Sequence, residues 1–390
     1  MTGSPTSLEI PPEDLQLPAD VAPRPTAEPP ARPDVLLTGA TGYLGAYLLR
    51  ELQANSIGTI WCLVRAADDR AAAARLATRC GEVGINPGSA IAVAGDFTKP
   101  LFGLDAERYH ELAEQIGAIH HCGASVNMND PYQLARIPNV QGTVETLRFA
   151  TSGPVKSVHH VSTMAVFISS RSCGLPRVSD ESEPALEYSG TFGYAASKYV
   201  AEQLVRQASA RGLPAAIYRP PFLPGDSATG RVSIGEPLST LLKVCVQLHA
   251  APQTLPLVPV CAVDHAARAI AALAPDAPRV GRPQAFNLHD PQPLALNEAV
   301  YALRRFGHEI NPLPLAEWLS LLAENRRTQP ARSLYAMFEM LPYLVQATPE
   351  HRLPDLAPAR ITTQLAAKGI TLPPTDDAFL TRLAAQISTA

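Results

Sequence analysis

Paired cysteines, long hydrophobic runs and an excess of basic charge are all missing from this sequence. Its six cysteines are scattered singly, without a C-x-x-C pair, so we expect reduced thiols in a cytoplasmic compartment. No apolar run approaches the length of a bilayer span and no positively charged leader precedes one, so we expect neither a membrane anchor nor a secretion signal. The formal net charge of −4 supplies no basic field for a phosphate backbone, which argues against nucleic acid as a partner.

Proline is the residue in surplus, with 38 copies in 390 residues against an average of about 5%. Much of the surplus lies before Asp34, in the stretch EIPPEDLQLPADVAPRPTAEPPARP. Such a composition buries too little apolar surface to fold and favours an extended, semi-rigid chain. We therefore expect residues 1–33 to be a proline-rich linker, which acts as a tether or docking arm; a frayed terminus is the open alternative.

From Asp34 onward, short continuous apolar runs alternate with helical patterns. Continuous apolar strands separated by helices predict a parallel sheet covered on both faces, which is an α/β fold with a Rossmann-type doubly wound sheet. Beyond Phe222 the alternation weakens and helical patterns dominate. We expect strands at 35–37, 59–64, 90–94, 118–122, 155–161 and 215–218, and helices at 44–52, 197–210, 263–272, 296–306 and 315–324.

These patterns divide the chain after the linker into two parts. A Rossmann domain is expected at residues 34–221, because the strand and helix patterns alternate regularly there. A smaller, mainly helical lobe that closes over the strand ends is expected at residues 222–390. Part of that lobe, about residues 257–290, is expected to return to the Rossmann domain.

A glycine-rich turn stands where the first strand meets the first helix, in the stretch TGATGYLG at residues 38–45. A dinucleotide site needs Gly39 for the tight turn and Gly42 for close approach of the backbone to the pyrophosphate. Gly45 lets the helix pack on the sheet, and the helix N-terminus supplies a favourable dipole. Spaced glycines alone are weak evidence, but here the flanking strand, helix and second strand appear in order. The turn therefore predicts a dinucleotide cofactor.

The end of the second strand favours NADPH over NADH. An NAD-dependent enzyme usually carries an acidic residue there for the ribose 2′-hydroxyl, whereas this chain has Arg65, with Arg75 further on. A guanidinium holds a 2′-phosphate through two parallel hydrogen bonds, although a solvated surface position is an equal alternative for Arg75. The later strand ends add Asp96 and Phe97 over the adenine, and Cys122, Gly123 and Ala124 beside the cofactor.

Tyr194 and Lys198 carry a Y-x-x-x-K spacing at the start of a predicted helix. The i, i+4 spacing places the phenol and the ammonium on one face. A nearby cation favours the phenolate and brings the pKa of the tyrosine closer to a useful range, and the lysine can also bind the nicotinamide ribose. Ser162 and Thr163 end the fifth strand, where a hydroxyl is expected in the cleft beside the nicotinamide. Together these residues predict a proton-handling site for a dehydrogenase or reductase.

Two histidine pairs suggest a metal site, which we do not expect. His120-His121 and His159-His160 each lie on a predicted strand, where neighbouring side chains point to opposite faces. One histidine of each pair therefore faces away from any shared metal, and strand or core histidines are the better interpretation. No cysteine stands beside a recognisable base, and hydride chemistry needs no thiol nucleophile.

These motifs in this order resemble the terminal thioester reductase domains of nonribosomal peptide and polyketide synthetases. They also resemble the reductase domain of carboxylic acid reductases, and both groups are extended short-chain dehydrogenases. The resemblance spans about residues 33–320 and rests on ordered blocks, which makes it specific. The blocks are VLLTGATGYLGAYLLREL, WCLVRA, AGDFTKPLFGL, AIHHCGASVN, NVQGTVETLRFA, KSVHHVSTMAV, GYAASKYVAEQLV, RGLPAAIYRP and FNLHDP.

The resemblance implies a catalytic triad of Thr163, Tyr194 and Lys198, with Arg65 and Arg75 on the 2′-phosphate of NADPH. It implies NADPH-dependent release of an acyl or peptidyl thioester, held on the phosphopantetheine arm of a carrier domain, as an aldehyde or further as an alcohol. We expect a monomer that needs no metal. The complete set of residues expected to bind the cofactor is Gly39, Thr41, Gly42, Tyr43, Leu44, Gly45, Arg65, Arg75, Asp96, Phe97, Cys122, Gly123, Ala124, Ser162, Tyr194, Lys198, Pro220 and Phe222.

One departure from the family and two rival functions stay open at this point. Pro221 stands where the family usually has glycine, and a proline removes a backbone N–H, which puts nicotinamide contacts there in doubt. The first rival is another extended dehydrogenase acting on a free sugar nucleotide or steroid, which Arg65 disfavours. The second is a regulator that binds NADP without turnover, which can dispense with the tyrosine and lysine that this chain retains. The stretch EDLQLPADVAP resembles the linker that follows a carrier domain in such synthetases, which would make the arm a functional tether.

Overall fold

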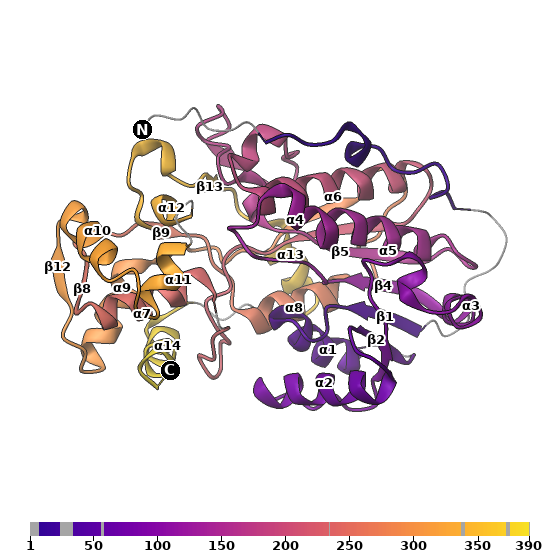
Figure 1. Ribbon diagram of the computed structural model, residues 1–390, viewed down its shortest axis with the longest axis horizontal. Coiled ribbons are helices and arrows are strands. Elements are labelled where there is room, and N and C mark those ends of the chain that lie inside the picture. Colours follow the sequence, from indigo (N-terminus) through magenta and orange to yellow (C-terminus); the bar gives the residue numbers. More distant parts are fainter. Residues whose placement is uncertain are drawn as a thin grey trace. The chain divides into compact units, whose positions relative to one another are not determined.

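The computed structural model describes residues 8–23, 34–55, 58–233, 235–336, 340–371 and 375–389. The chain divides into two compact units, shown in Figure 1. The first contains residues 1–166, 191–219 and 266–286, and the second contains residues 167–190, 220–265 and 287–390. The division differs from the expected boundaries mainly in that residues 167–190 belong to the second unit rather than to the Rossmann part, and the segment that returns to the first unit is 266–286 rather than about 257–290.

A seven-stranded sheet forms the centre of the first unit, in the order β10-β7-β5-β4-β1-β2-β3. The pairings from β7 to β3 are parallel, which confirms the predicted doubly wound sheet. The strand order reverses between β1 and β4, and in such sheets ligands bind beside the carboxyl ends of the strands at this point. The strands are β1 (Asp34–Thr38), β2 (Ile60–Val64), β3 (Ile91–Ala94), β4 (Ile116–His121), β5 (Ser157–Val161), β7 (Ala215–Arg219) and β10 (Gln284–Asn287).

Helices cover both faces of this sheet, with α4, α5 and α6 on one side and α1 and α2 on the other (Figure 1). Each presents an apolar face to the strands; in α2, for example, Ala72, Leu76 and Cys80 are buried at four-residue spacing, and the Asp68 carboxylate caps the helix by accepting from the Ala71 N–H over 2.8 Å. The helices are α1 (Tyr43–Asn55), α2 (Asp69–Glu82), α3 (Ala106–Gln115), α4 (Tyr132–Arg136), α5 (Gly142–Ala150) and α6 (Gly193–Ala210). Shorter turns are η1 (Pro12–Leu15), η2 (Pro100–Gly103), η3 (Ile137–Gln141) and η4 (Met164–Phe167).

The second unit is mainly helical, as predicted, and three short strand pairs tie its loops together. Its core includes Trp318, which is fully buried and donates its indole N–H to the carbonyl of Ala250 over 3.0 Å. The helices are α7 (Pro237–Gln247), α8 (Val263–Leu273, which enters the first unit at residue 266), α9 (Leu296–Arg305), α10 (Leu315–Glu324), α11 (Ala331–Ala336), α12 (Leu341–Val345), α13 (Arg360–Ala367) and α14 (Asp377–Thr389), with turns η5 (Leu186–Ser189) and η6 (Pro349–His351). The strand pairs are β8 (Ala250–Pro252) with β12 (Asn311–Leu313), β9 (Leu257–Val258) with β11 (Leu294–Ala295), and β6 (Arg177–Val178) with β13 (Asp355–Leu356).

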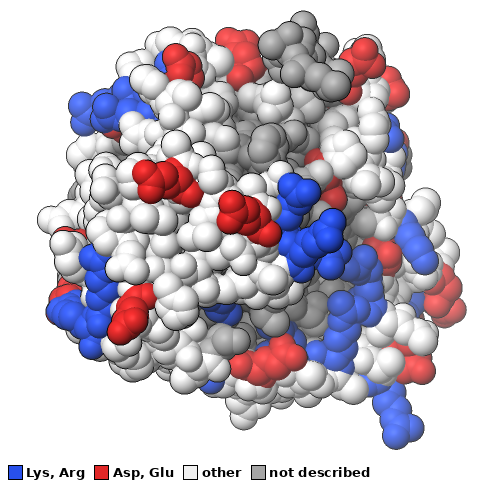
Figure 2. Space-filling model, turned by 60° about the vertical axis from the view of Figure 1, so that its left-hand side comes forward, with Lys and Arg blue, Asp and Glu red and all other residues white. Residues whose placement is uncertain are grey.

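Charged side chains are sparse on the surface, in line with the 17% of charged residues in the sequence. On the face shown in Figure 2, basic side chains gather toward one side and acidic ones are scattered over a largely uncharged surface. Within the part of the chain that the structure describes, no helix has both the length and the apolar character needed to cross a bilayer.

Residues 8–23 depart from the expectation that a proline-rich arm buries too little surface to fold. This segment packs against the first unit, where Val21 is fully buried and Leu17 is 4% exposed. The composition of the arm alone did not predict this, because the surface that it contacts is built by helices far along the chain. The rest of the predicted arm lies outside the described residues.

Candidate active site

The glycine-rich turn between β1 and α1 is packed so tightly that two of its glycines have no room for a side chain. Gly39 has a φ of +76°, and a Cβ there would lie 2.6 Å from the amide nitrogen of Gly123 at the end of β4. A Cβ on Gly45 would lie 2.0 Å from the carbonyl oxygen of Gly39. The turn is closed by the Gly42 N–H, which donates to the Gly39 oxygen over 2.8 Å. The carboxyl ends of β1 and β4 therefore meet beside the N-terminus of α1, where backbone N–H groups can hold a phosphate.

The remaining residues of the turn have different environments. Thr41 and Tyr43 are partly exposed, and the Tyr43 ring packs edge-on against Tyr47 with centroids 5.7 Å apart. Leu44 is 8% exposed and belongs to the core beneath α1. At this position only the backbone is available to a ligand, because the side chain faces the sheet.

Arg65 and Arg75 come together at the carboxyl end of β2. Both side chains are exposed, and the Arg75 Nη1 donates to the backbone carbonyl of Arg65 over 2.8 Å. This hydrogen bond holds the guanidinium of Arg75, a residue of α2, beside the backbone of Arg65. The end of β2 therefore carries two positively charged side chains. Exposed guanidinium groups of this kind can bind a phosphate through parallel hydrogen bonds, so the predicted role of Arg65 and Arg75 remains open to test.

Phe97 and Asp96 occupy the turn after β3, but they have different roles there. The Phe97 ring packs against two glycines, Gly123 after β4 and Gly142 at the start of α5. A Cβ on either glycine would lie 2.5 Å from the ring. The Phe97 ring also packs edge-on against His121, with centroids 5.4 Å apart. Asp96 accepts from the N–H and the hydroxyl of Thr98 at 3.0 and 2.8 Å, so it holds its own turn.

The end of β4 is tied to β1 through one hydroxyl. The Thr38 hydroxyl lies 2.8 Å from the Nδ1 of His121 and accepts from the Gly123 N–H over 3.1 Å. Burial raises the pKa of the Cys122 thiol to about 12, so it is a neutral thiol rather than a nucleophile. Ala124 follows on the partly exposed side of the same turn.

Tyr194 and Thr163 meet at the end of β5. The Thr163 hydroxyl hydrogen-bonds the Tyr194 phenol, and the phenol lies in a buried environment. Burial raises the pKa of Tyr194 to about 12, and the bond from Thr163 opposes this rise. The sequence predicted instead that the nearby lysine would bring the pKa of the tyrosine down. In this structure desolvation dominates, so the phenol is protonated and can donate a proton.

Lys198 stands one helical turn beyond Tyr194 and is held by the strand below. Its ammonium donates to the Val161 carbonyl over 2.7 Å and lies 3.4 Å from the Nε2 of His160. Burial lowers the pKa of Lys198 to about 8, and the Glu202 carboxylate opposes this shift. The ammonium is therefore anchored at the carboxyl end of β5, on the same helix face as the phenol.

Asn139 is a further functional candidate to which the sequence pattern assigned no role. Its amide Nδ2 donates to the Ser125 carbonyl at 3.0 Å and to the Ser197 hydroxyl at 2.9 Å, and its Oδ1 accepts from the Ser125 N–H at 2.8 Å. The Ser197 hydroxyl in turn donates to the Tyr194 carbonyl at 2.7 Å. Asn139 therefore ties the loop after β4 to the first turn of α6. The available signal was Pro138, which removes a helical N–H and marks the irregular turn η3.

A buried ion pair holds the same helix to β7. Arg219 donates from Nε and Nη2 to the two carboxylate oxygens of Glu202, at 2.9 and 2.7 Å, and neither side chain is exposed. Burial raises the pKa of Glu202, but the Arg219 guanidinium, helped by Arg206, more than offsets this effect and holds that pKa below its usual range. The pair fixes the helix that carries Tyr194 and Lys198 against the sheet.

The histidines form two cross-strand stacks, one on each face of the sheet. His120 and His159 are stacked with centroids 4.3 Å apart, and His121 lies 5.6 Å from His160 on the opposite face. Burial lowers the pKa of all four rings, so they are neutral. Among the residues described, no group of three or more histidine, cysteine or carboxylate side chains could hold a metal ion.

Two of the residues predicted to bind the cofactor belong to the second unit. Pro220 follows β7 directly and is buried, and Phe222 forms a bridge with Val260 while its carbonyl accepts from the Cys261 N–H over 3.0 Å. Ser162 is buried at the end of β5, and its N–H donates to the Tyr218 carbonyl over 2.6 Å. The first unit thus brings together most of the predicted residues, while Pro220 and Phe222 lie in the second unit; the role of each of these residues in catalysis or cofactor binding stays a prediction.

Comparison with known proteins places these features in one family. A family model described as male sterility protein, NAD-binding, matches residues 37–270. The chain is 32% identical over 341 residues to a nonribosomal peptide synthetase of Aspergillus flavus, asaC, and 30% identical over 373 residues to the large subunit of L-2-aminoadipate reductase of Penicillium chrysogenum. These matches cover 83% and 90% of the chain but only 32% and 26% of the relatives, so the chain spans about a third or less of their length.

A solved structure matches over nearly the whole chain. The terminal R domain from the myxalamid PKS-NRPS pathway is 31% identical, with a TM-score of 0.85, and the match covers 97% of this chain and 96% of that one. The R domain of a nonribosomal peptide synthetase from Mycobacterium tuberculosis has a TM-score of 0.75 at 24% identity, which shows a common fold. The residues matched by the family model, 37–270, include the turn after β1 and the Tyr194–Lys198 helix.

Proposed function

Since the chain belongs to the male sterility NAD-binding family and, with the terminal R domains, to the extended short-chain dehydrogenases, we propose a reductase function for it. In this proposal the chain uses NADPH to release a carrier-bound acyl or peptidyl thioester as an aldehyde. The observation that carries the proposal is the meeting of Thr163, Tyr194 and Lys198 at the end of β5. Cys122 links this group to the glycine turn, because its backbone abuts Gly39 and its thiol lies close to both Tyr194 and Lys198.

The residues around the turn fit a dinucleotide. The N-terminus of α1 and the crowded Gly39–Gly45 turn leave the backbone free to approach a pyrophosphate, and the guanidinium groups of Arg65 and Arg75 can bind a 2′-phosphate. NADPH, when bound, supplies the hydride for the substrate carbonyl carbon. The protein supplies binding, orientation and a proton.

Tyr194 is the group that handles this proton. Because its pKa is raised to about 12, the phenol is neutral near pH 7 and can donate to a carbonyl oxygen on which negative charge develops. Thr163 orients the phenol through its hydroxyl. Lys198, held by the Val161 carbonyl, stabilises the phenolate that remains after the proton has moved.

The thioester becomes a hemithioacetal once its carbonyl carbon has gained the hydride and its oxygen the proton. Breaking the C–S bond then gives an aldehyde and a thiolate, and the hydroxyl proton neutralises the thiolate to the free carrier thiol. No acyl-enzyme is needed, which agrees with the neutral, buried thiol of Cys122. A second reduction of the aldehyde to an alcohol would use the same groups, so product analysis defines the end point.

Tyr194→Phe tests the role of the phenol. We expect kcat for NADPH oxidation with a synthetic acyl-pantetheine thioester to fall by about 100-fold or more, since general acids contribute about 10²–10⁴ in rate. The Kd for NADPH should stay within about twofold, because the phenol hydrogen is a small part of cofactor binding. Tyr199→Phe, on the same helix but on another face, is the matched control and should keep its activity. A fully active Tyr194→Phe protein would contradict the assignment.

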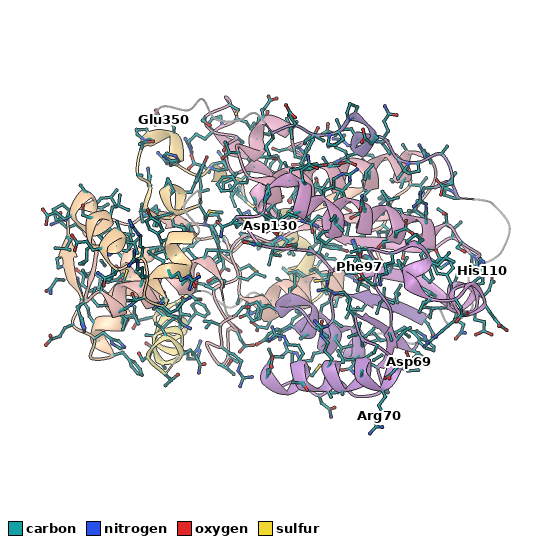
Figure 3. The ribbon with its side chains drawn as sticks, viewed as in Figure 1. Asp69, Arg70, Phe97, His110, Asp130 and Glu350 are labelled. Carbon is teal, nitrogen blue, oxygen red and sulfur yellow. The ribbon has the colours of Figure 1, made fainter. Side chains whose placement is uncertain are left out.

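Arg65→Ala tests the cofactor preference. Losing a charge-assisted bond worth about 1.5–3 kcal/mol should raise the Kd for NADPH about 10- to 100-fold and leave that for NADH nearly unchanged. Arg70→Ala is the matched control, because Arg70 is exposed on α2 and extends away from the ribbon (Figure 3). Equal losses for both cofactors would contradict a role for Arg65 in binding the 2′-phosphate.

A further inference from the structure

The described N-terminal segment, residues 8–23, is held near its middle by a buried carboxylate. Asp14, 7% exposed, accepts from the Tyr132 hydroxyl at 2.8 Å and from the Nε and Nη2 of Arg136 at 2.5 and 2.6 Å. Burial and the Asp14 carboxylate both raise the pKa of Tyr132, so the phenol stays a hydrogen donor. Three donors on one buried carboxylate hold this part of the segment on α4.

The later part of the segment is fixed on the last turn of α6. Arg211 donates to three of its backbone carbonyls, those of Leu17, Pro18 and Val21, at 2.7, 2.5 and 2.9 Å. Gln207 accepts from the Leu17 N–H over 2.9 Å and donates to the carbonyl of Leu15, the residue after Asp14, over 2.8 Å. These bonds use the backbone of the segment, while the side chains of Leu17 and Val21 are buried beneath it.

These two attachments give the segment a direction along the sheet. Helix α6 begins at the edge where the parallel strands end: Lys198 reaches the Val161 carbonyl there, and a Cβ on Gly193 would lie 2.3 Å from the Tyr132 amide nitrogen of α4. Helix α6 ends at the opposite edge, just before β7 begins at Ala215. From Asp14, which bonds to α4, to Val21, which bonds to Arg211, the segment therefore runs away from the active-site edge and toward the edge where the strands begin.

The direction decides where any preceding chain leaves the first unit. Without the docked segment, the attachment point would be Asp34, the first residue of β1, which lies at the edge away from the active site. With it, the chain reaches its first attachment, Asp14, on the side of α4, the helix that packs beside the first turn of α6, which bears Tyr194. In Figure 1 the segment runs beside α6 along the first unit.

We propose that residues 8–23 are an anchor that holds a preceding carrier domain at the catalytic edge of the sheet, with Asp14 and Arg211 as its two attachment points. The proposal rests on the proposed function, because only a carrier-bound substrate requires delivery. Releasing the anchor would lengthen the tether by the whole segment and move its origin to the far edge. Since effective concentration falls roughly as the −3/2 power of tether length, delivery would fall several-fold without any change in the chemistry.

The test uses the full chain joined behind a carrier domain that is loaded with an acyl-phosphopantetheine group. Asp14→Ala releases the segment from α4, and Arg211→Ala releases it from α6 without touching the buried carboxylate. Arg305→Ala, which removes an exposed ion pair with Asp377, is the matched control. Single-turnover reduction of the attached thioester is compared with steady-state reduction of a free acyl-pantetheine thioester. Hydrogen exchange at the Leu17 amide, which is bonded to Gln207, reports whether the segment has left its surface.

We expect both release variants to lower the rate with the attached carrier by about fivefold or more and to leave the rate with the free thioester within about twofold of wild type. Equal losses on both substrates would show that the segment only supports the fold and would overturn the anchor. An unchanged rate with the attached carrier, together with fast exchange at the Leu17 amide, would overturn it as well. A wild-type protein that reduces the free thioester but not the attached one would contradict the carrier part of the proposed function, and the anchor with it.

Discussion

Replacing Glu202 by alanine is expected to destabilise the first unit by about 3–5 kcal/mol, because it removes one partner of a buried ion pair. Glu202 and Arg219 are both fully buried and share two hydrogen bonds, at 2.9 and 2.7 Å. The variant leaves a buried guanidinium without its carboxylate. The free-energy cost of this unpaired charge is larger than the stability that the intact ion pair adds over two apolar residues in the same place. Exposed ion pairs, by comparison, contribute about 0–1 kcal/mol.

The assay is urea unfolding followed by far-ultraviolet circular dichroism at pH 7, with thermal unfolding as a second measurement. A loss of about 3–5 kcal/mol corresponds to a fall in Tm of about 6–20 °C for a unit of this size. Glu82→Ala, which removes the exposed pair with Arg79, is the matched control and should change stability by less than about 1 kcal/mol. The double replacement Glu202→Leu with Arg219→Met should recover most of the loss, because neither member of the pair is then left as a buried charge without its partner.

The pH dependence gives the same prediction a second check. In the folded chain Arg219 holds the pKa of Glu202 below its usual range, against the opposite effect of burial. The stabilisation is therefore fully present above the ordinary glutamate pKa of about 4.3 and is lost as the pH falls through the lower folded value. The difference between wild type and Glu202→Ala should narrow on acidification. A variant within about 1 kcal/mol of wild type at pH 7 would refute the reasoning.

Three further predictions follow from other parts of the molecule. Gly45→Ala places a Cβ 2.0 Å from the Gly39 carbonyl oxygen, and overpacking of this kind costs about 1–3 kcal/mol. Calorimetric titration should therefore show about tenfold weaker NADPH binding. The control Gly81→Ala, which has open space around its Cβ, should bind NADPH normally. Burial raises the pKa of Asp290 to about 6, so ionisation of this carboxyl lowers the stability of the folded protein as the pH rises from about 4 through 6. Urea unfolding should therefore show that Asp290→Asn is more stable than wild type at pH 7.5 but not at pH 4. A gain in stability that does not depend on pH would contradict this. The exposed thiol of Cys173 should react first with iodoacetamide, and Cys173→Ser should remove the fast phase seen by mass spectrometry; a fast phase that persists would contradict it.

The central sheet could be predicted from the sequence because its signals are local. Continuous apolar runs predicted β1, β2, β3, β4, β5 and β7, and the structure confirms them with small shifts at the ends, for example Ile60–Val64 within the predicted 59–64. The mainly helical second unit was predicted from the change in pattern after Phe222. The turn at residues 38–45 and the Tyr194–Lys198 spacing are likewise short motifs whose geometry follows from a single turn or one helical repeat.

The edge strand β10 was not predicted, because Gln284–Asn287 is short and lies in the part of the sequence where helical patterns dominate. Asn139 and Glu202 fall within quoted sequence blocks, yet their partners, Ser125 and Arg219, lie on other elements. A residue's own neighbours in the sequence say nothing about a partner that folding brings from elsewhere.

What the sequence by itself determined is the order of strands and helices, the family, and the residue types at the candidate site. Only the tertiary structure decided the charge states there, because burial raises the pKa of Tyr194 and lowers that of Lys198 by removing water that no local motif describes. It also decided the course of the proline-rich segment. A composition that cannot form its own core still docks, because Tyr132, Arg136, Gln207 and Arg211 supply from distant helices the donors and acceptors that the segment meets.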